Sequence, residues 1–185
     1  MPGTNEGNVF FISDFDDALE GSVILPLTEE IAKQSRFKDG RIDLYINSVG
    51  GYLHLLRHMV ELVEIAKAQG IVVRTIVPEM AFSAGSMLAI AGTPGERYIG
   101  REAEHLIHYG QIMSFETTPE QIKRFTAFKE RKMKANLEHY RKYAKVPDID
   151  KHMLDDGFFV PAPKCIRWGL ADKYMDKMPT LKFDA

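Results

Sequence analysis

Cysteine is scarce in this sequence, with Cys165 alone among 185 residues. One cysteine cannot form an intramolecular disulfide, and the chain has no Cys/His spacing typical of a zinc site. His54 and His58 lie four positions apart on a predicted helix, but no third ligand accompanies them at a recognisable spacing. We therefore expect no metal site, no cofactor, exposed positions for both histidines, and a buried or half-buried Cys165.

An excess of charge of one sign is also missing, because the formal net charge is −2 at pH 7 and both signs are scattered along the chain. A basic stripe for nucleic acid and a polybasic membrane anchor are both absent. No apolar run reaches membrane-spanning length, and residues 1–8 lack the basic and apolar regions of a signal peptide. We expect a cytoplasmic protein that binds neither nucleic acid nor membrane.

Apolar residues make up 45% of the chain and charged residues 27%. This composition supports one sizeable core, so we expect a single domain over residues 1–185. Hydrophobic patterning predicts alternating strands and helices, which is typical of an α/β fold with a mainly parallel sheet. The expected strands are 9–12, 42–46, 71–77, 96–100, 105–108 and one near 171–174, and the expected helices are 26–34, 52–69, 82–92 and 148–156.

A long, polar helix is also expected, from Pro119 to about Tyr143. Thr118 can cap it, Pro119 occupies the first helical position, and Glu120 lies in the first turn. Its apolar stripe is broken and most other positions are charged. Such a helix should project from the body or lie in a subunit interface.

The chain is organised around residues 71–92, where an apolar β-branched run stops at Pro78 and an uncharged segment of small residues follows. This pattern predicts a strand that leads into a buried helix with Ser83 at its start. Ser83 has two interpretations: a helix cap, or a nucleophile beside backbone N–H groups that stabilise a developing oxyanion. Gly50 and Gly51 follow the second predicted strand, where glycine permits unusual backbone conformations and close approach of a ligand.

Four segments in this order resemble the proteolytic subunit of the Clp protease. Ile-Asn-Ser-Val-Gly-Gly at residues 46–51 is similar to the family's Ile-Asn-Ser-Pro-Gly-Gly turn, and residues 82–92 resemble its nucleophile segment. Leu-Ile-His at residues 106–108 resembles the family's histidine strand, and His108 follows Ser83 by 25 residues, the family's interval. Trp-Gly-Leu-Ala-Asp at residues 168–172 resembles Tyr-Gly-Leu-Val-Asp. The resemblance extends from about residue 9 to residue 174.

The resemblance implies a ClpP/crotonase-like fold of repeated ββα units. Its head would comprise residues of about 9–110 and 146–178, and a projecting handle helix would comprise about 118–145. It implies a serine endopeptidase that hydrolyses peptides or unfolded proteins inside a self-compartmentalised homo-oligomer of stacked rings. The first strand begins near residue 9, with no counterpart of the family's leading helix, so an ATPase unfoldase is a possible but doubtful partner.

The same resemblance assigns catalytic roles. Ser83 would be the nucleophile and His108 the general base. The backbone N–H groups of Gly51 and Ala84 would form the oxyanion hole.

The orienting aspartate is less well defined by the resemblance. An ungapped match places the family's aspartate on Gly157, which has no side chain to orient the imidazole. One inserted residue makes Asp156 the third member of a Ser-His-Asp triad, and Asp155 is the alternative.

Other interpretations stay open at this stage. The chain could be a catalytically inactive ClpP-like structural paralogue, or a crotonase-fold acyl-CoA enzyme that uses similar oxyanion donors without a serine nucleophile. Tyr109 and Gly110 follow His108 where the family has proline two residues after its histidine, so substrate binding is expected to differ. His105 and His139 have no catalytic context and are expected on the surface.

Overall fold

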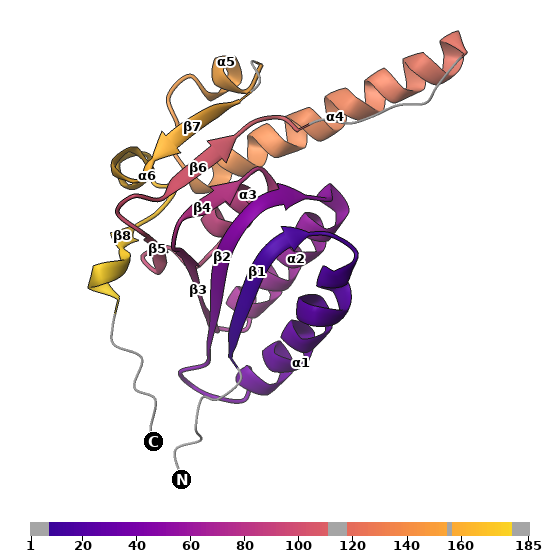
Figure 1. Cartoon of the computed structure of the whole chain (residues 1–185). Coiled ribbons are helices and arrows are strands. Elements are labelled where there is room, and N and C mark those ends of the chain that lie inside the picture. Colours follow the sequence, from indigo (N-terminus) through magenta and orange to yellow (C-terminus); the bar gives the residue numbers. More distant parts are fainter. Residues whose placement is uncertain (1–7, 111–117, 155–156, 179–185) are drawn as a thin grey trace.

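The computed structural model describes residues 8–110, 118–154 and 157–178. These residues form a sheet with helices packed against it and one long helix that projects from the body (Figure 1). The strands are Val9–Phe15 (β1), Arg41–Gly51 (β2), Val72–Val77 (β3), Met80–Phe82 (β4), Arg97–Ile99 (β5), Glu104–Ile107 (β6), Phe158–Pro161 (β7) and Lys173–Tyr174 (β8). The helices are Leu25–Gln34 (α1), Leu53–Ala68 (α2), Ala84–Ile90 (α3), Pro119–Tyr143 (α4), Ile149–Leu154 (α5) and Ala162–Trp168 (α6), with a π-helical turn Glu20–Ile24 and a 3-10 turn Met175–Lys177.

The sheet has the strand order β7-β6-β4-β2-β3-β5-β8, and β1 pairs with the long strand β2. Every pairing in the described chain is parallel except that of β6 with β7. Parallel neighbours need crossover connections, which α1, α2 and α3 supply. The predicted α/β fold class with a mainly parallel sheet is therefore confirmed.

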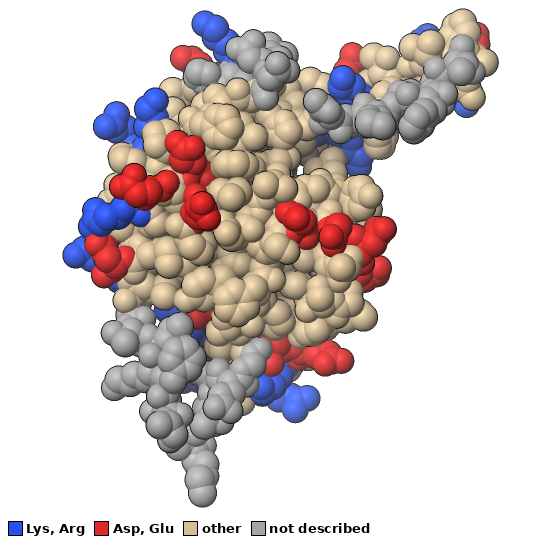
Figure 2. Space-filling model, viewed as in Figure 1, with Lys and Arg blue, Asp and Glu red and all other residues tan. Residues whose placement is uncertain are grey.

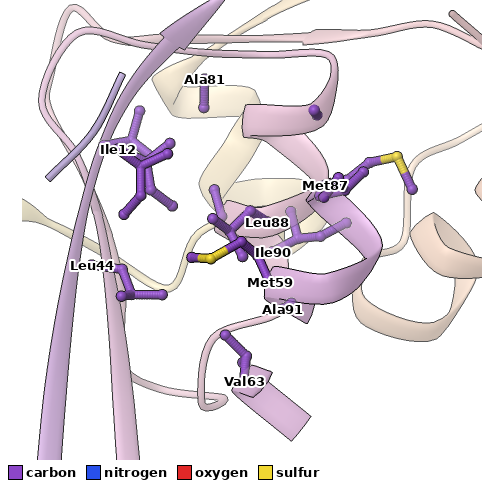
Figure 3. Packing of buried hydrophobic residues seen from close by; sticks show 14 of the residues in the cluster. Ile12, Leu44, Met59, Val63, Ala81, Met87, Leu88, Ile90 and Ala91 are labelled. Atoms are coloured by element: carbon purple, nitrogen blue, oxygen red, sulfur yellow. The ribbon is translucent and has the colours of Figure 1, made fainter. Parts of the chain in front are cut away.

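The hydrophobic core lies around α3, as the uncharged sequence of that segment predicts. All seven residues of α3 are buried. Figure 3 shows Leu88 and Ile90 of this helix beside Met59 of α2, with Leu44 of β2 nearby. A helix covered on all sides keeps a fixed position, so it can hold a reactive group at its end.

Helix α4 spans Pro119–Tyr143, as predicted from its end signals. The Gln121 N–H donates to Thr118 Oγ1 at 3.3 Å, and the Gln121 side chain accepts from the Thr118 N–H, which completes a capping box. Only the C-terminal part of α4 is buried, at Asn136, Leu137 and Tyr140, and the rest leaves the body in Figure 1. Among the described helices, none is both long and apolar enough to span a bilayer.

Several elements differ from the prediction. Strand β2 continues through Gly51 instead of ending near residue 47, because its last residues pair with the end of β1. The short strands β4 and β7 and the helix α6 were not predicted. Three or four residues are too few to show an alternating pattern, and two prolines obscure the start of α6.

Candidate active site

Ser83 joins β4 to α3 in a backbone conformation that is unusual for serine, with φ of 53° and ψ of −115°. Its N–H donates to the Leu106 carbonyl of β6 at 2.9 Å, and its own carbonyl accepts from the Met87 N–H at 3.1 Å. The strand and the helix together hold this conformation. Such strain costs on the order of 1–3 kcal/mol and clusters at functional sites.

The Ser83 side chain makes no capping hydrogen bond to α3, so the helix-cap interpretation of this serine is wrong. The Ala84 N–H, the first of the helix, has no hydrogen-bond partner in the described part of the chain. A serine hydroxyl and an N–H group at the positive end of a buried helix are therefore both unused by the local fold.

One cleft, with a volume of about 180 Å³, brings together Ser83, His108, Gly51 and Ala84. These four residues come from the ends of β2 and β6 and from the start of α3. The remaining lining residues are Tyr52, Leu53, Leu56, Met87, Tyr109, Gly110 and Asn136. Most of this wall is apolar, which suits a ligand that contributes both a reactive group and apolar surface.

Gly50 and Gly51 bring the end of β2 against Ser83 with φ values of 106° and 138°. A Cβ atom on Gly51 would lie 2.4 Å from the Phe15 carbonyl oxygen, and one on Gly50 would lie 2.7 Å from the Ser83 Cβ. No larger residue fits between β1 and Ser83. The paired glycines are therefore required by close packing as well as by backbone conformation.

His108 follows β6 directly and is half-buried. Burial lowers the pKa of its imidazole, which favours the neutral form at neutral pH. Its Nε2 atom is buried and has no hydrogen-bond partner among the described residues, and no hydrogen bond joins it to Ser83 there. A neutral imidazole with an unpaired nitrogen is the form that a general base requires.

Gly157 lies opposite His108, because β7 pairs antiparallel with β6 in a register that matches Phe158 with Ile107. A Cβ atom on Gly157 would lie 2.7 Å from the His108 Cβ, and φ is 99°. The position of the family's aspartate in the ungapped match is thus too tight for a side chain. Asp156 and Asp155, the two predicted carriers of the orienting carboxylate, lie outside the described residues.

Asn136 is a site residue that the sequence reasoning missed. It is buried at the base of α4, accepts from Arg57 Nη2 at 3.3 Å, and donates through Nδ2 to the Tyr109 carbonyl at 3.3 Å. Helix α4 therefore supplies part of the cleft wall and holds the backbone just after His108. In the sequence, the sole signal that Asn136 is buried was its uncharged amide beside Leu137 in an otherwise charged helix.

Two histidines do not lie where the sequence reasoning placed them. His105, expected on the surface, is fully buried, because the alternation of β6 points it to the same helix-covered face as Ile107. His139, also expected on the surface, is half-buried and donates through Nε2 to the Met87 carbonyl at 2.7 Å. By contrast, the predicted exposure of His54 and His58 and the predicted burial of Cys165 are confirmed.

A mainly parallel α/β sheet with a strained serine at a helix start and a histidine in the same cleft is typical of serine hydrolases. A sequence profile described as Clp protease matches residues 4–178, so the chain belongs to the Clp protease family.

Similar proteins include the ATP-dependent Clp protease proteolytic subunits of Streptococcus pyogenes serotype M5 (strain Manfredo), serotype M49 (strain NZ131) and serotype M1. Each is 37% identical over 93 residues, which cover 50% of this chain and 44% of the relative. The chain thus matches less than half the length of these relatives.

Proposed function

We propose that the protein is a serine endopeptidase that cleaves peptide bonds with Ser83 as nucleophile and His108 as general base. One observation carries the proposal: Ser83 is held in a strained conformation at the start of a buried helix, with its side chain unused as a cap, in the cleft that contains His108. The side-chain oxygen of a structural serine at a helix start would normally accept a hydrogen bond from a backbone N–H of the first turn. Membership of the Clp protease family supports the same function.

In the proposed reaction, Ser83 Oγ attacks the carbonyl carbon of the scissile bond while His108 takes the hydroxyl proton. The tetrahedral intermediate collapses to an acyl-enzyme, and the imidazolium donates its proton to the leaving amine. Water then attacks the acyl-enzyme through the same steps, which releases the acid product and restores Ser83. A serine hydroxyl is a weak nucleophile at neutral pH, so the low pKa of His108, which keeps the base neutral, favours the first step.

The oxyanion of the intermediate is assigned to the backbone N–H groups of Gly51 and Ala84. Both residues line the cleft beside Ser83, and the Ala84 N–H belongs to the positive end of α3. Loss of a single donor of this kind typically lowers kcat by about 10²–10³. The third member of the triad is proposed as Asp156, with Asp155 as the alternative.

The proposed active form is a homo-oligomer of stacked rings, with peptides or unfolded proteins as substrates. Residues of about 9–110 and 146–178 would form the head of a single peptidase domain, and α4 would be the handle between rings. Figure 2 shows few charged side chains on the face over β1 and β2, where Phe11 and Val49 are 73% and 61% exposed. Such a face suits contact with another copy of the chain.

We further propose a cytoplasmic location. We also propose that cleavage of short peptides needs no ATP, because the phosphate-binding motif Gly-x-x-x-x-Gly-Lys-(Ser/Thr) does not occur in the sequence. The names of the similar streptococcal proteins describe subunits of an ATP-dependent protease. Any energy-dependent unfolding would therefore belong to a separate ATPase partner. The purified chain should cleave a short fluorogenic peptide at the same rate with and without ATP.

Labelling with a serine-directed fluorophosphonate tests the proposal. Wild-type protein should be labelled at Ser83, and Ser83→Ala should abolish both labelling and peptide cleavage. Ser13→Ala, at an exposed serine of β1, is the matched control and should be labelled like the wild type. Equal labelling of wild type and Ser83→Ala would overturn the assignment.

A second candidate function is a catalytically inactive structural subunit. Gly157 favours it, because this residue occupies the place opposite His108 where the family match expects a carboxylate. Assembly into rings together with absence of fluorophosphonate labelling would support this function over the peptidase.

A further inference from the structure

A buried chain of three polar side chains connects the elements that carry Ser83 and His108. Ser86 Oγ of α3 lies 3.0 Å from His105 Nδ1 of β6, and burial raises the pKa of the Tyr140 hydroxyl of α4 while its interaction with the Ser86 side chain lowers it. Each of the three residues is at most 1% exposed. None of them lines the cleft, and the proposed reaction does not use them.

This chain adds a second attachment between α3 and β6. The first is the hydrogen bond from the Ser83 N–H to the Leu106 carbonyl at 2.9 Å. Ser86 lies about one helical turn beyond Ser83, and His105 directly precedes Leu106. Two attachments about one turn apart prevent α3 from rotating about its axis relative to β6.

The base of α4 reinforces this arrangement. The Tyr140 hydroxyl interacts with the Ser86 side chain, and its neighbour His139 donates to the Met87 carbonyl at 2.7 Å. Two adjacent residues of the projecting helix therefore hold two adjacent residues of α3. Rotation of α3 would move Ser83 Oγ and the Ala84 N–H together relative to His108.

Stability alone is a poor explanation for these three polar side chains. Buried polar groups lose their hydrogen bonds to water, and apolar side chains of similar shape often stabilise a core as well or better. Hydrogen bonds, however, have directions and fix one arrangement of the elements that they join. Reactions that depend on aligned groups are sensitive to displacements of about 1 Å.

We infer that Ser86, His105 and Tyr140 are positioning residues that hold Ser83 in line with His108. The inference rests on the proposed peptidase function, because it specifies how the same site is kept in register. It also makes the base of α4, whose projecting part is the proposed contact between rings, a direct support of the nucleophile helix.

Two conservative variants test the inference. Tyr140→Phe and Ser86→Ala each remove one hydroxyl, and each should lower kcat and the rate of fluorophosphonate labelling about tenfold while KM stays within about twofold. Tyr143→Phe, on the same helix as Tyr140, removes a hydroxyl that bonds to Glu64 of α2, and it is the matched control. Labelling rates equal to the wild type in both test variants would overturn the inference, whatever their melting temperatures.

A rescue pair separates positioning from simple packing. His105→Asn keeps a polar atom close to the place of Nδ1, whereas His105→Leu fills similar space without one. We expect the asparagine variant to retain most of the labelling rate and the leucine variant to lose it, with both assembled as in the wild type. Equal rates in the two variants would contradict a role for the hydrogen bond.

Hydrogen–deuterium exchange gives a readout that does not depend on activity. The amides of α3 should exchange faster in Tyr140→Phe than in Tyr143→Phe if the network holds the helix. If the wild type itself is not labelled, the peptidase proposal fails, and the exchange of α3 still decides whether the network restrains this helix. Unchanged exchange in Tyr140→Phe would overturn the restraint in either case.

Discussion

At the scale of single residues, the conformation of Ser83 links stability to the proposed chemistry. Glycine adopts positive φ angles without the steric cost that serine incurs. Ser83→Gly should therefore raise the free energy of unfolding by about 1 kcal/mol while it removes the nucleophile. Urea denaturation at fixed pH checks this, with Ser13→Gly in β1 as a control that should not stabilise. A destabilised Ser83→Gly would mean that the strain is relieved by other contacts.

The third member of the proposed triad is either Asp156 or Asp155, and single substitutions distinguish the two. If Asp156 orients His108, Asp156→Asn should lower kcat by several orders of magnitude, because an amide favours the wrong imidazole tautomer. Asp155→Asn should then change kcat little. Rates on one fluorogenic peptide rank the two variants, and the opposite ranking transfers the role to Asp155. Near-wild-type rates in both would indicate that Ser83 and His108 work as a dyad.

At the scale of elements, a buried ion pair joins β2 to β3 near the start of β2, at the opposite end of that strand from Gly51. Arg74 Nε donates to Asp43 Oδ1 at 2.7 Å, and Arg74 Nη2 donates to Asp43 Oδ2. Asp43 and Arg74 are 0% and 2% exposed. Asp43→Ala leaves the guanidinium buried without its main partner, and should lower the free energy of unfolding by about 3–5 kcal/mol.

The double variant Asp43→Leu/Arg74→Leu is the matched control for this pair. It removes both charges, so it should be far less destabilising than Asp43→Ala. Urea denaturation of the two variants beside the wild type gives the comparison. A double variant as unstable as Asp43→Ala would show that packing, and not the unpaired charge, dominates.

At the scale of the whole molecule, the buried His105 and the half-buried His139 should make the protein sensitive to mild acid. Burial lowers the pKa of His105 to about 3 and that of His139 to about 4, against about 6.5 in an unfolded chain. The unfolded state therefore binds more protons below pH 6.5, so stability falls as the pH drops from 6.5 toward 4. Each histidine contributes a slope of at most about 1.4 kcal/mol per pH unit.

Urea denaturation at pH 6.5, 5.5 and 4.5 checks the acid sensitivity. Burial raises the pKa of Glu64, but hydrogen bonds from Lys67 and Tyr143 outweigh this effect and lower the pKa to about 2. Protonation of Glu64 therefore reduces stability only below about pH 4.5. His105→Asn should reduce the slope, and His58→Asn at an exposed position is the matched control. A slope unchanged by His105→Asn would contradict the assignment.

Assembly is the other property of the whole molecule that can be measured directly. The proposed rings require α4 to contact a second copy, and Ile122 and Phe128 on this helix are 50% and 39% exposed. Replacing both with glutamate should reduce the mass of the assembly measured by light scattering, because like charges would meet at the contact. A strictly monomeric wild type at micromolar concentration would contradict the ring proposal.

The sequence by itself determined the features that local patterns encode. Alternating strands and helices gave the fold class, and Thr118 and Pro119 defined the start of α4, because capping and φ restriction act within a few residues. The uncharged segment after Ser83 predicted a buried helix, since charged groups cannot be left unpaired in a core.

Only the tertiary structure decided how distant segments meet. The positive φ of Ser83 depends on β2, β6 and α3 packing around it, and the burial of His105 depends on which face of β6 the helices cover. Gly157 lies opposite His108 because of a strand register that β7 was too short to reveal. Asn136 reaches the cleft because α4 docks its base there. Such pairings join residues far apart in the chain, and a local pattern contains no record of them.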